Sequence, residues 1–370
     1  MKISVITYHR VYNYGSALQA YATIKYFERL GHEAEIIDYC PQRYLNYGSF
    51  KQIFNESQMH YDSVIKSAVV TVIKVPSYKM QKKVFDRFLG QYVPLTKTYY
   101  SEKELWEDTP IADVYCTGSD QVWNNFFIKD FERPFFLTFV PKDKKRIAYS
   151  ASFGKSSLTK DELHKVEKDL QQYSAISVRE QSGLDILIGI DVPIKTRVLD
   201  PTYMLIKKDW EQLANPLGEK EPFILVYQLH GDSKAAEYAV ELSKVTGLKI
   251  IRLTNMLHQR MKGGSIRLLP TVNEFVSYIN NAEYIVTDSF HGTSFSINLN
   301  KKFIVTYPSH FSNRLDNILN ITELTDRVAN SAEEAILISK KEIDYKKVNR
   351  LLTVQREITN DFMIKVLNGD

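Results

Sequence analysis

Short apolar runs of strand length alternate with segments of helical periodicity along most of the chain. An apolar run at 3–7 precedes a helical pattern at 17–30, and a second strand-like run follows at 34–37. The same order returns in the second half, where strand-like runs at 223–227 and 284–287 are each followed by helical spacing. Because parallel strands need a long crossover between them, this alternation predicts an α/β fold with parallel sheets covered by helices.

The length of 370 residues exceeds what one hydrophobic core usually serves, so two domains are expected. A segment with two prolines, a glycine and several charges, 213–222, is typical of a linker. We therefore predict a Rossmann-like first domain at 1–212, a Rossmann-like second domain at 220–345 and a C-terminal helix at 346–370. The two parallel-sheet domains are expected to face each other across a cleft.

The first domain is predicted to carry a helical insertion at about 41–110. Residues 41–55 are rich in Tyr and Asn and are typical of a loop, whereas 62–73 has the spacing of an amphipathic helix. Basic side chains fall in and after that helix: Lys66, Lys74, Lys79, Lys82, Lys83 and Arg87. We interpret them as a solvated basic face. The alternative is peripheral contact with an anionic membrane or a lipid-linked substrate.

Composition narrows the classes of function. The net charge of +4 is too small and too spread out to indicate nucleic-acid binding, but it suits an anionic small substrate. Cys40 and Cys116 are the only cysteines, the first residues read as a strand and not as a signal peptide, and no apolar run is long enough to span a membrane. We expect a cytoplasmic protein without metal or other cofactor; a homo-oligomer remains open.

Polar clusters follow the predicted strands. In the first, Asn13 and Gly15 stand at a helix start, where backbone N–H groups could hold an anion. It is not the glycine pattern of a dinucleotide site, so NAD is not predicted. In the second, Gly118 allows close backbone approach, Ser119 offers a hydroxyl, and Asp120 could act as a general base or accept a sugar hydroxyl. The alternative is that Ser119 or Asp120 caps a helix.

Two further clusters bring a cation and a histidine to strand ends. Arg179 could clamp a carboxylate or phosphate, or it could form a salt bridge with Glu180 or another neighbour. Asp288, Ser289 and His291 occupy a polar turn before a helix predicted to begin at residue 293. Capping would explain the aspartate and the serine, but not a histidine followed by glycine.

All these clusters fall after strands, and the carboxyl ends of parallel strands meet at one edge of a sheet. Ligands of open α/β folds bind at that edge, where loops and helix N-termini converge. We therefore expect the clusters to line one cleft, and we interpret their convergence as the sign of an enzyme.

In order and spacing, these motifs resemble the polysaccharide pyruvyl transferase family. The matching pieces are Asn13-Tyr14-Gly15, Thr117-Gly118-Ser119-Asp120-Gln121-Val122-Trp123-Asn124, Val178-Arg179-Glu180, Leu199-Asp200-Pro201 and Ser289-Phe290-His291-Gly292. The resemblance runs from residue 13 to about 320. It implies a GT-B-like fold of two Rossmann-like domains. It also implies transfer of a pyruvyl group from phosphoenolpyruvate to two hydroxyls of a sugar, in the biosynthesis of a cell-surface polysaccharide, with a cyclic ketal and phosphate as products.

This chemistry suits the residues at hand. His291 would protonate the enol carbon of the donor, and Asp120 would take a proton from the attacking hydroxyl. Arg179 is the first choice for holding the donor's carboxylate and phosphate, and Arg314 the second. Family members commonly have an Arg-Leu pair before the histidine, where this chain has Ser289 and Phe290. Another cation therefore substitutes, or the donor differs.

Two other functions fit parts of the pattern. A GT-B glycosyltransferase with a nucleotide-sugar donor would have the same cleft, with 288–293 at the pyrophosphate. A non-catalytic sugar-binding protein would use some of the 23 Tyr and 19 Phe as stacking surfaces. Mutation separates the last alternative, because His291→Ala should abolish turnover but spare acceptor binding only in an enzyme.

Overall fold

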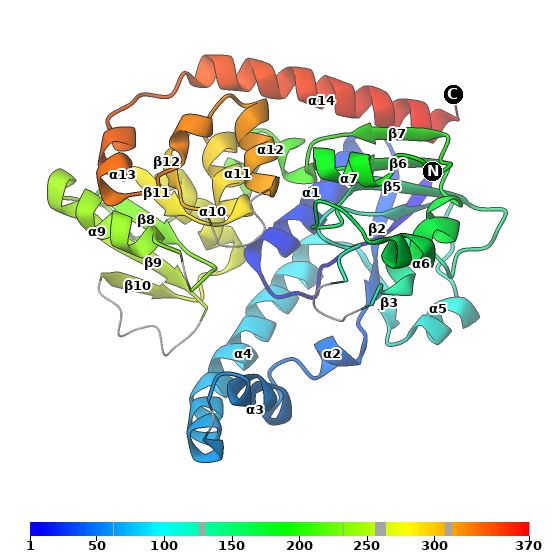
Figure 1. Cartoon of the computed structure of the whole chain (residues 1–370), viewed down its shortest axis with the longest axis horizontal. Coiled ribbons are helices and arrows are strands. Elements are labelled where there is room, and N and C mark those ends of the chain that lie inside the picture. Colours follow the sequence, from blue (N-terminus) through cyan, green and yellow to red (C-terminus); the bar gives the residue numbers. More distant parts are fainter. Residues whose placement is uncertain (62, 126–129, 232, 256–263, 308–312, 370) are drawn as a thin grey trace.

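The computed structural model describes residues 1–61, 63–125, 130–231, 233–255, 264–307 and 313–369. They fold into two α/β domains, each built on a wholly parallel sheet (Figure 1). In the first sheet the strand order is β3-β2-β1-β4-β5-β6-β7, and in the second it is β10-β9-β8-β11-β12. In each sheet the chain first adds strands on one side of a central strand, β1 or β8, and then continues on its other side. Each domain therefore has its own topological switch point at that strand.

The strands of the first sheet are β1 (Lys2–Ile6), β2 (Glu33–Tyr39), β3 (Leu95–Tyr99), β4 (Val114–Thr117), β5 (Lys145–Ala151), β6 (Ala175–Val178) and β7 (Ile194–Arg197). Those of the second are β8 (Phe223–Tyr227), β9 (Lys249–Thr254), β10 (Ser265–Leu268), β11 (Tyr284–Thr287) and β12 (Lys302–Val305). The predicted fold class is confirmed. Strands β3 and β10 were not predicted, since both are half-polar edge strands without a continuous apolar run.

Helices cover both sheets and connect their strands. They are α1 (Tyr14–Arg29), α5 (Glu102–Glu107), α6 (Lys160–Leu170), α7 (Gln181–Ile186), α8 (Lys207–Leu213), α9 (Ala235–Thr246), α10 (Val272–Asn281), α11 (Phe290–Asn298), α12 (Asn313–Ile321) and α13 (Ala332–Ser339). Short 3-10 turns lie at η1 (Arg133–Phe136), η2 (Pro201–Tyr203) and η4 (Thr325–Arg327). Helix starts follow the expected caps, for example Asn13, whose side chain accepts a hydrogen bond from the backbone N of Ser16 at 2.7 Å.

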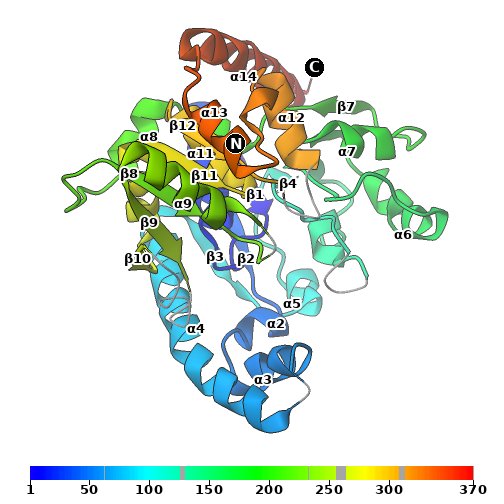
Figure 2. The ribbon, with the colours of Figure 1, turned by 60° about the vertical axis from the view of Figure 1, so that its left-hand side comes forward.

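The region predicted as a helical insertion contains α2 (Gln42–Leu45), α3 (Phe50–Gln58) and α4 (Val64–Tyr92), and it also supplies β3 to the sheet. The loop prediction for 41–55 is wrong, because α2 and α3 occupy most of it. The helix predicted at 62–73 continues to Tyr92 with Pro76 inside it, and residue 62 lies outside the described residues. Helix α3 and the first half of α4 project away from both sheets (Figures 1 and 2).

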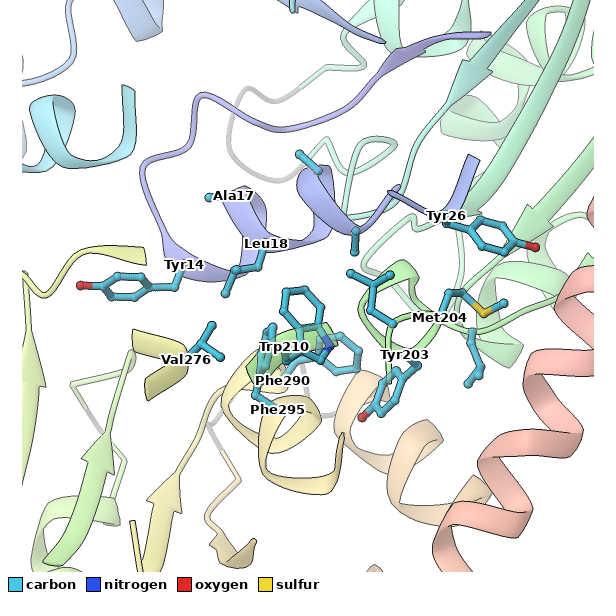
Figure 3. Close-up of a cluster of buried hydrophobic side chains, with 14 of the residues drawn as sticks. Tyr14, Ala17, Leu18, Tyr26, Tyr203, Met204, Trp210, Val276, Phe290 and Phe295 are labelled. Atoms are coloured by element: carbon cyan, nitrogen blue, oxygen red, sulfur yellow. The ribbon is translucent and has the colours of Figure 1, made fainter. Parts of the chain in front are cut away.

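One hydrophobic cluster joins the two domains. Figure 3 shows side chains of α1 together with Trp210 of the first domain, packed against Phe295 and neighbouring side chains of the second. The ring of Tyr14 stacks on that of Phe275 with centroids 4.4 Å apart, and the Trp210 and Phe295 rings lie 4.7 Å apart. Such continuous apolar burial favours a fixed arrangement of the two sheets over free hinge motion.

The last helix, α14 (Tyr345–Asn368), runs from the second domain back across the first, along the top of Figure 1. Its Asn360 accepts a hydrogen bond from the Tyr26 hydroxyl at 2.9 Å, and its Thr359 hydroxyl accepts one from the Leu199 backbone N at 3.2 Å. Arg356 donates to the Tyr203 carbonyl at 2.6 Å and, in the second domain, to Asn298 Oδ1 of α11 at 3.3 Å. The helix thus ties both domains together on the side away from α3. None of the helices formed by the described residues combines the length and apolar content needed to cross a bilayer.

Candidate active site

A cavity of about 640 Å³ lies between the domains, at the carboxyl ends of β1, β4, β8 and β11. The first domain lines it with side chains of the β1 and β4 loops and of the helical insertion: Tyr8, Val11, Asn13, Gly15, Ser16, Arg43, Tyr44, Gln52, Glu56, Asp120, Gln121 and Asn124. The second domain contributes Tyr227, Leu229, His230, Asp288, Ser289, Phe290, His291, Arg314 and Leu315. Six of the residues predicted at strand ends line this one cavity, namely Asn13, Gly15, Asp120, Asp288, Ser289 and His291, whereas Gly118, Ser119 and Arg179 do not.

His291 lies in the first turn of α11 and is almost fully buried. The helix begins at Phe290, one turn before the predicted start, because the Ser289 side chain caps it by accepting a hydrogen bond from the backbone N of Gly292 at 3.2 Å. A side chain at Gly292 would place its Cβ 2.4 Å from Thr287 Oγ1, so glycine lets the helix approach β11.

The ring of His291 packs across the domain boundary onto α1. A Cβ added at Gly15 would lie only 2.0 Å from His291 Nδ1, so no residue larger than glycine fits there without movement. Nε2 of the same ring is buried and has no hydrogen-bond partner among the described residues. Buried polar atoms normally have a partner, and the exceptions often belong to functional sites.

Burial lowers the pKa of His291 to about 4, since a charged imidazolium would lose its hydration. The carboxylates of Asp200 and Asp120 act in the opposite direction, and the guanidinium groups of Arg179 and Arg314 oppose them in turn. In the protein without a bound substrate, His291 is therefore neutral at pH 7.

Asp120 lines the cavity directly after β4. Its Oδ2 accepts a hydrogen bond from Ser16 Oγ at 2.9 Å, and its Oδ1 accepts one from the backbone N of Gln121 at 2.8 Å. Burial acts to raise the pKa of Asp120, but the positive charges of Arg179 and Arg314 hold it below its ordinary value. The residue has a φ of 77°, a left-handed conformation that is strained for a residue other than glycine and that recurs at functional sites.

Arg179 lies beneath the cavity and does not line it. Its Nη1 donates to Asp200 Oδ2 at 2.9 Å, Nε lies 3.6 Å from Glu180 Oε2, and Nη2 lies 3.8 Å from Asp120 Oδ1. The structure thus shows the ion pair with neighbours, which was the alternative to a substrate clamp. The guanidinium carbon also lies 4.8 Å from the centre of the Phe290 ring.

Gly118 and Ser119 also lie below the cavity. A Cβ on Gly118 would come within 2.9 Å of Val5 Cγ1, so this glycine serves close packing of β4 against β1. The Ser119 hydroxyl donates to Asp200 Oδ2 at 2.9 Å, and its carbonyl accepts from Thr7 Oγ1 at 2.6 Å. Ser119 thus supports Asp200, the ion-pair partner of Arg179, and neither Gly118 nor Ser119 is among the residues that line the cavity.

Arg314, at the start of α12, faces the cavity from the second domain. Among the described residues it has no carboxylate within ion-pair distance. With the amide of Gln121 turned so that both groups are paired, the Gln121 oxygen accepts hydrogen bonds from Arg314 Nε at 3.2 Å and Nη2 at 3.1 Å. Burial lowers the pKa of Arg314 to about 10, and the like charge of Arg179 adds to this effect. A cation that is desolvated but lacks a counterion is suited to binding an anion.

Asp288 holds the loop after β8 in place. Its two carboxylate oxygens accept hydrogen bonds from the backbone N of Leu229 at 2.8 Å and of His230 at 2.9 Å, and Nδ1 of His230 lies 3.2 Å from Oδ2. It does not cap α11, a role that Ser289 takes. Asn13, which caps α1, and Gly15 both border the cavity as predicted for a helix N-terminus.

The insertion supplies cavity residues that the sequence interpretation did not include. Arg43 forms a two-point ion pair with Glu132, and its Nη2 donates to the Tyr44 hydroxyl at 3.2 Å. Gln52 and Glu56 reach the cavity from α3. The signal for them in the sequence is the Tyr-rich and Asn-rich composition of 41–55, which by itself predicts only a loop. In the part of the chain that the structure covers, no group of three His, Cys, Asp or Glu side chains is arranged to hold a metal ion.

Comparison with known families and folds agrees with this geometry. The family model for polysaccharide pyruvyl transferase matches residues 13–310. No curated protein sequence matched the chain.

Solved structures with a similar fold include the UDP-GlcNAc 2-epimerase from Methanocaldococcus jannaschii, at 14% identity and a TM-score of 0.52, covering 96% of this chain and 99% of that one. The UDP-GlcNAc 2-epimerase from Neisseria meningitidis has 11% identity and a TM-score of 0.50, with 100% of both chains covered. AviGT4, a glycosyltransferase involved in avilamycin A biosynthesis, has 11% identity and a TM-score of 0.50, covering 99% of this chain and 97% of that one. These likenesses confirm a GT-B-like fold.

Proposed function

Because the chain belongs to the polysaccharide pyruvyl transferase family, we propose that it transfers the pyruvyl group of phosphoenolpyruvate to two hydroxyls of a sugar. The acceptor is a cell-surface polysaccharide or its precursor, and the product is a cyclic ketal. The observation that carries this proposal is the grouping of His291, Asp120 and Arg314 around one cavity between the domains. This reaction needs a proton donor, a proton acceptor and a cation free to bind an anion, and Arg314 has no carboxylate partner in the described part of the chain.

Arg314 is the group best placed to hold the donor. Phosphoenolpyruvate carries a carboxylate and a phosphate, and Arg314 is the cavity-lining arginine without a carboxylate partner in the described part of the chain. It also answers the departure at Ser289 and Phe290, since the guanidinium carbon of Arg314 lies 5.6 Å from the centre of the Phe290 ring. A cation from α12 thereby stands beside Phe290, the residue that directly follows the position where other members have arginine.

Two helix N-termini support the same site. Both α1 and α11 begin at the cavity, through Asn13 and Ser289 respectively, and the positive end of each helix dipole favours an anion there. Arg179 adds positive charge from beneath but is neutralised by Asp200 and its neighbours. We therefore assign direct contact with the donor to Arg314, and we assign to Arg179 the positioning of Asp120 and Phe290.

The proposed reaction begins with protonation of the donor and ends with closure of the ketal ring. His291, once protonated, gives its proton to the methylene carbon of phosphoenolpyruvate, and the double-bond electrons form the new C–H bond. A sugar hydroxyl attacks the cation left at the adjacent carbon, while Asp120 accepts the hydroxyl proton. Phosphate then leaves with its bridging oxygen and its electron pair. The second hydroxyl attacks the same carbon and gives its proton to His291, which closes the ketal and restores the protonated acid, while the departing phosphate takes the proton held by Asp120.

The first test is thermal stability with phosphoenolpyruvate, inorganic phosphate and nucleotide sugars as separate ligands. A ligand at about 100 times its Kd should add roughly 2.7 kcal/mol, which is measurable as a higher Tm. We expect phosphoenolpyruvate to raise the Tm of the wild type and of the control Arg350→Gln, an exposed arginine of α14, but not of Arg314→Gln. A shift with a nucleotide sugar alone would refute the proposed donor and favour the glycosyltransferase alternative.

The second test separates donor binding from chemistry. His291→Asn should keep the thermal shift with phosphoenolpyruvate but release no phosphate when donor and acceptor are both present. General acid catalysis typically contributes about 10²–10⁴-fold to the rate. Turnover by this variant within a few-fold of the wild type would exclude His291 as the acid.

A further inference from the structure

The first half of α4 has the reverse of the usual amphipathic arrangement. Its inward face, toward α3, is made of small or polar side chains, including Ser67, Thr71 and Ser77, all of them buried. Its outward face is apolar: Ile65, Val69 and Val72 have 77%, 54% and 62% of their surface exposed. A soluble surface helix normally buries the apolar side, so this inversion indicates that something apolar covers the outer face.

The exposed apolar side chains form one continuous stripe. Ile65, Val69, Val72, Ile73 and Met80 recur at helical spacing, and Pro76 lies exposed in the same row. From residue 65 to residue 80 the stripe is about 22 Å long at 1.5 Å per residue. Most of the stripe lies on the first half of α4, which projects away from both sheets (Figures 1 and 2).

The charge on α4 restricts what can cover the stripe. The helix has five lysines and one arginine but only one acidic residue, Asp86, which is paired with Arg10 at 2.9 Å. Lys66, Lys79 and Lys83 are exposed on the same outer side as the stripe. Pairing with a second copy of this chain would bring two basic helices together, which like charges oppose. An anionic lipid surface complements both the apolar stripe and its basic border.

We propose that the outer face of α4 docks on an anionic phospholipid bilayer, with the stripe in the acyl boundary and the lysines at the headgroups. The helix lies in the plane of the interface and does not cross the membrane, as amphipathic helices with a basic border do. Long lysine side chains reach the headgroup level while their stems cover apolar surface.

Docking at this place has a consequence for the acceptor, and this consequence rests on the proposed function. Gln52 and Glu56 of α3 line the cavity, and the Tyr78 hydroxyl on the inner face of α4 donates to Glu56 Oε2 at 3.1 Å. The docking face and the cavity wall therefore belong to one helical hairpin. An acceptor sugar anchored in the bilayer through a lipid would reach the cavity from that side.

The experiment is cosedimentation of the full chain with vesicles of phosphatidylglycerol and phosphatidylcholine at low salt, compared with vesicles of phosphatidylcholine alone. We expect binding to the anionic vesicles and a loss of it with added salt. The triple variant Val69→Gln/Val72→Gln/Ile73→Gln should bind at least about tenfold more weakly, because apolar side chains no longer enter the lipid. Each of Lys66→Gln and Lys79→Gln should weaken binding by about fivefold.

A matched control is Val354→Gln/Ile358→Gln, two exposed apolar residues on α14, which should bind like the wild type. All these positions are exposed, and equal Tm values will show that each variant is folded. Wild-type protein that stays in the supernatant, or a triple variant that binds undiminished, would overturn the proposal. So would a concentration-dependent dimer that the triple variant loses without any vesicle binding. None of these readouts involves phosphoenolpyruvate, so the membrane proposal and the proposed function can fail separately.

Discussion

Replacing His291 with asparagine should remove a pH dependence from the stability of the protein. Burial lowers the pKa of His291 to about 4, whereas a histidine in an unfolded chain has a pKa of about 6.5. Below pH 6.5 the unfolded chain therefore binds a proton that the folded protein does not. The free energy of unfolding must fall as the pH falls from about 6.5 to 4, and this contribution is fully present above that window.

The size of the effect follows from the two pKa values. A shift of one unit corresponds to 1.36 kcal/mol, so the full contribution is about 3 kcal/mol and the part lost between about pH 7 and pH 5 is about 2 kcal/mol. Most carboxylates keep their charge at pH 5. The effect of His291 on stability can therefore be distinguished from the effects of Asp120 and Asp200. Their pKa values are lowered, so protonation of these carboxylates reduces the free energy of unfolding only at more acidic pH.

Urea unfolding at both pH values, for the wild type and His291→Asn, measures this difference. We expect the wild type to lose about 2 kcal/mol more than the variant between the two conditions. His164→Asn, at an exposed position on α6, is the matched control and should behave like the wild type. Equal losses in the wild type and His291→Asn would show that the histidine is not held neutral by burial. That result would refute the electrostatic reasoning.

The remaining predictions concern the packing and charge around the same ring. Gly15→Ala should cost about 1–3 kcal/mol in urea unfolding and abolish turnover, because the new methyl group would collide with the ring of His291, while Gly90→Ala, which meets no atom within 4 Å, should be neutral or stabilising. A variant with normal turnover would contradict the close contact. Asp200→Asn should cost about 3–5 kcal/mol in the same measurement, since it leaves the guanidinium of Arg179 buried without its nearest counter-charge. A loss below about 1 kcal/mol would show that the pair is not needed for folding.

The sequence predicted the fold best where strands are buried on both faces. The segments 223–227 and 284–287 are apolar runs, and they form β8 and β11 with the predicted bounds. Strands β3 and β10 escaped prediction because they lie at sheet edges, where half of the side chains face water and the apolar run is broken. Hydrophobic periodicity detects burial, and it is therefore weakest at edges.

The sequence predicted which strand ends carry the candidate site. It did not predict which of the side chains there point into the cavity. Asp120 and His291 follow strands and line the cavity, and Arg314 lines it from a helix start. Arg179 also follows a strand, but its guanidinium is paired with Asp200, which follows β7, at 2.9 Å. Sequence spacing cannot tell a residue that faces the cleft from one that turns into the layer beneath, because that depends on which neighbouring strand end carries the opposite charge.

The proposed reaction needs a protonated His291, and the charges around this residue indicate that it becomes protonated only when the donor binds. In the resting cavity, burial outweighs the attraction of Asp120 and Asp200, so the ring carries no proton at pH 7. Phosphoenolpyruvate would place negative charge beside the ring and would neutralise Arg314, which now opposes protonation. Both changes raise the pKa of His291 toward neutrality. A proton would then enter together with the donor, so the charged acid would exist only when an enol carbon is present to receive its proton.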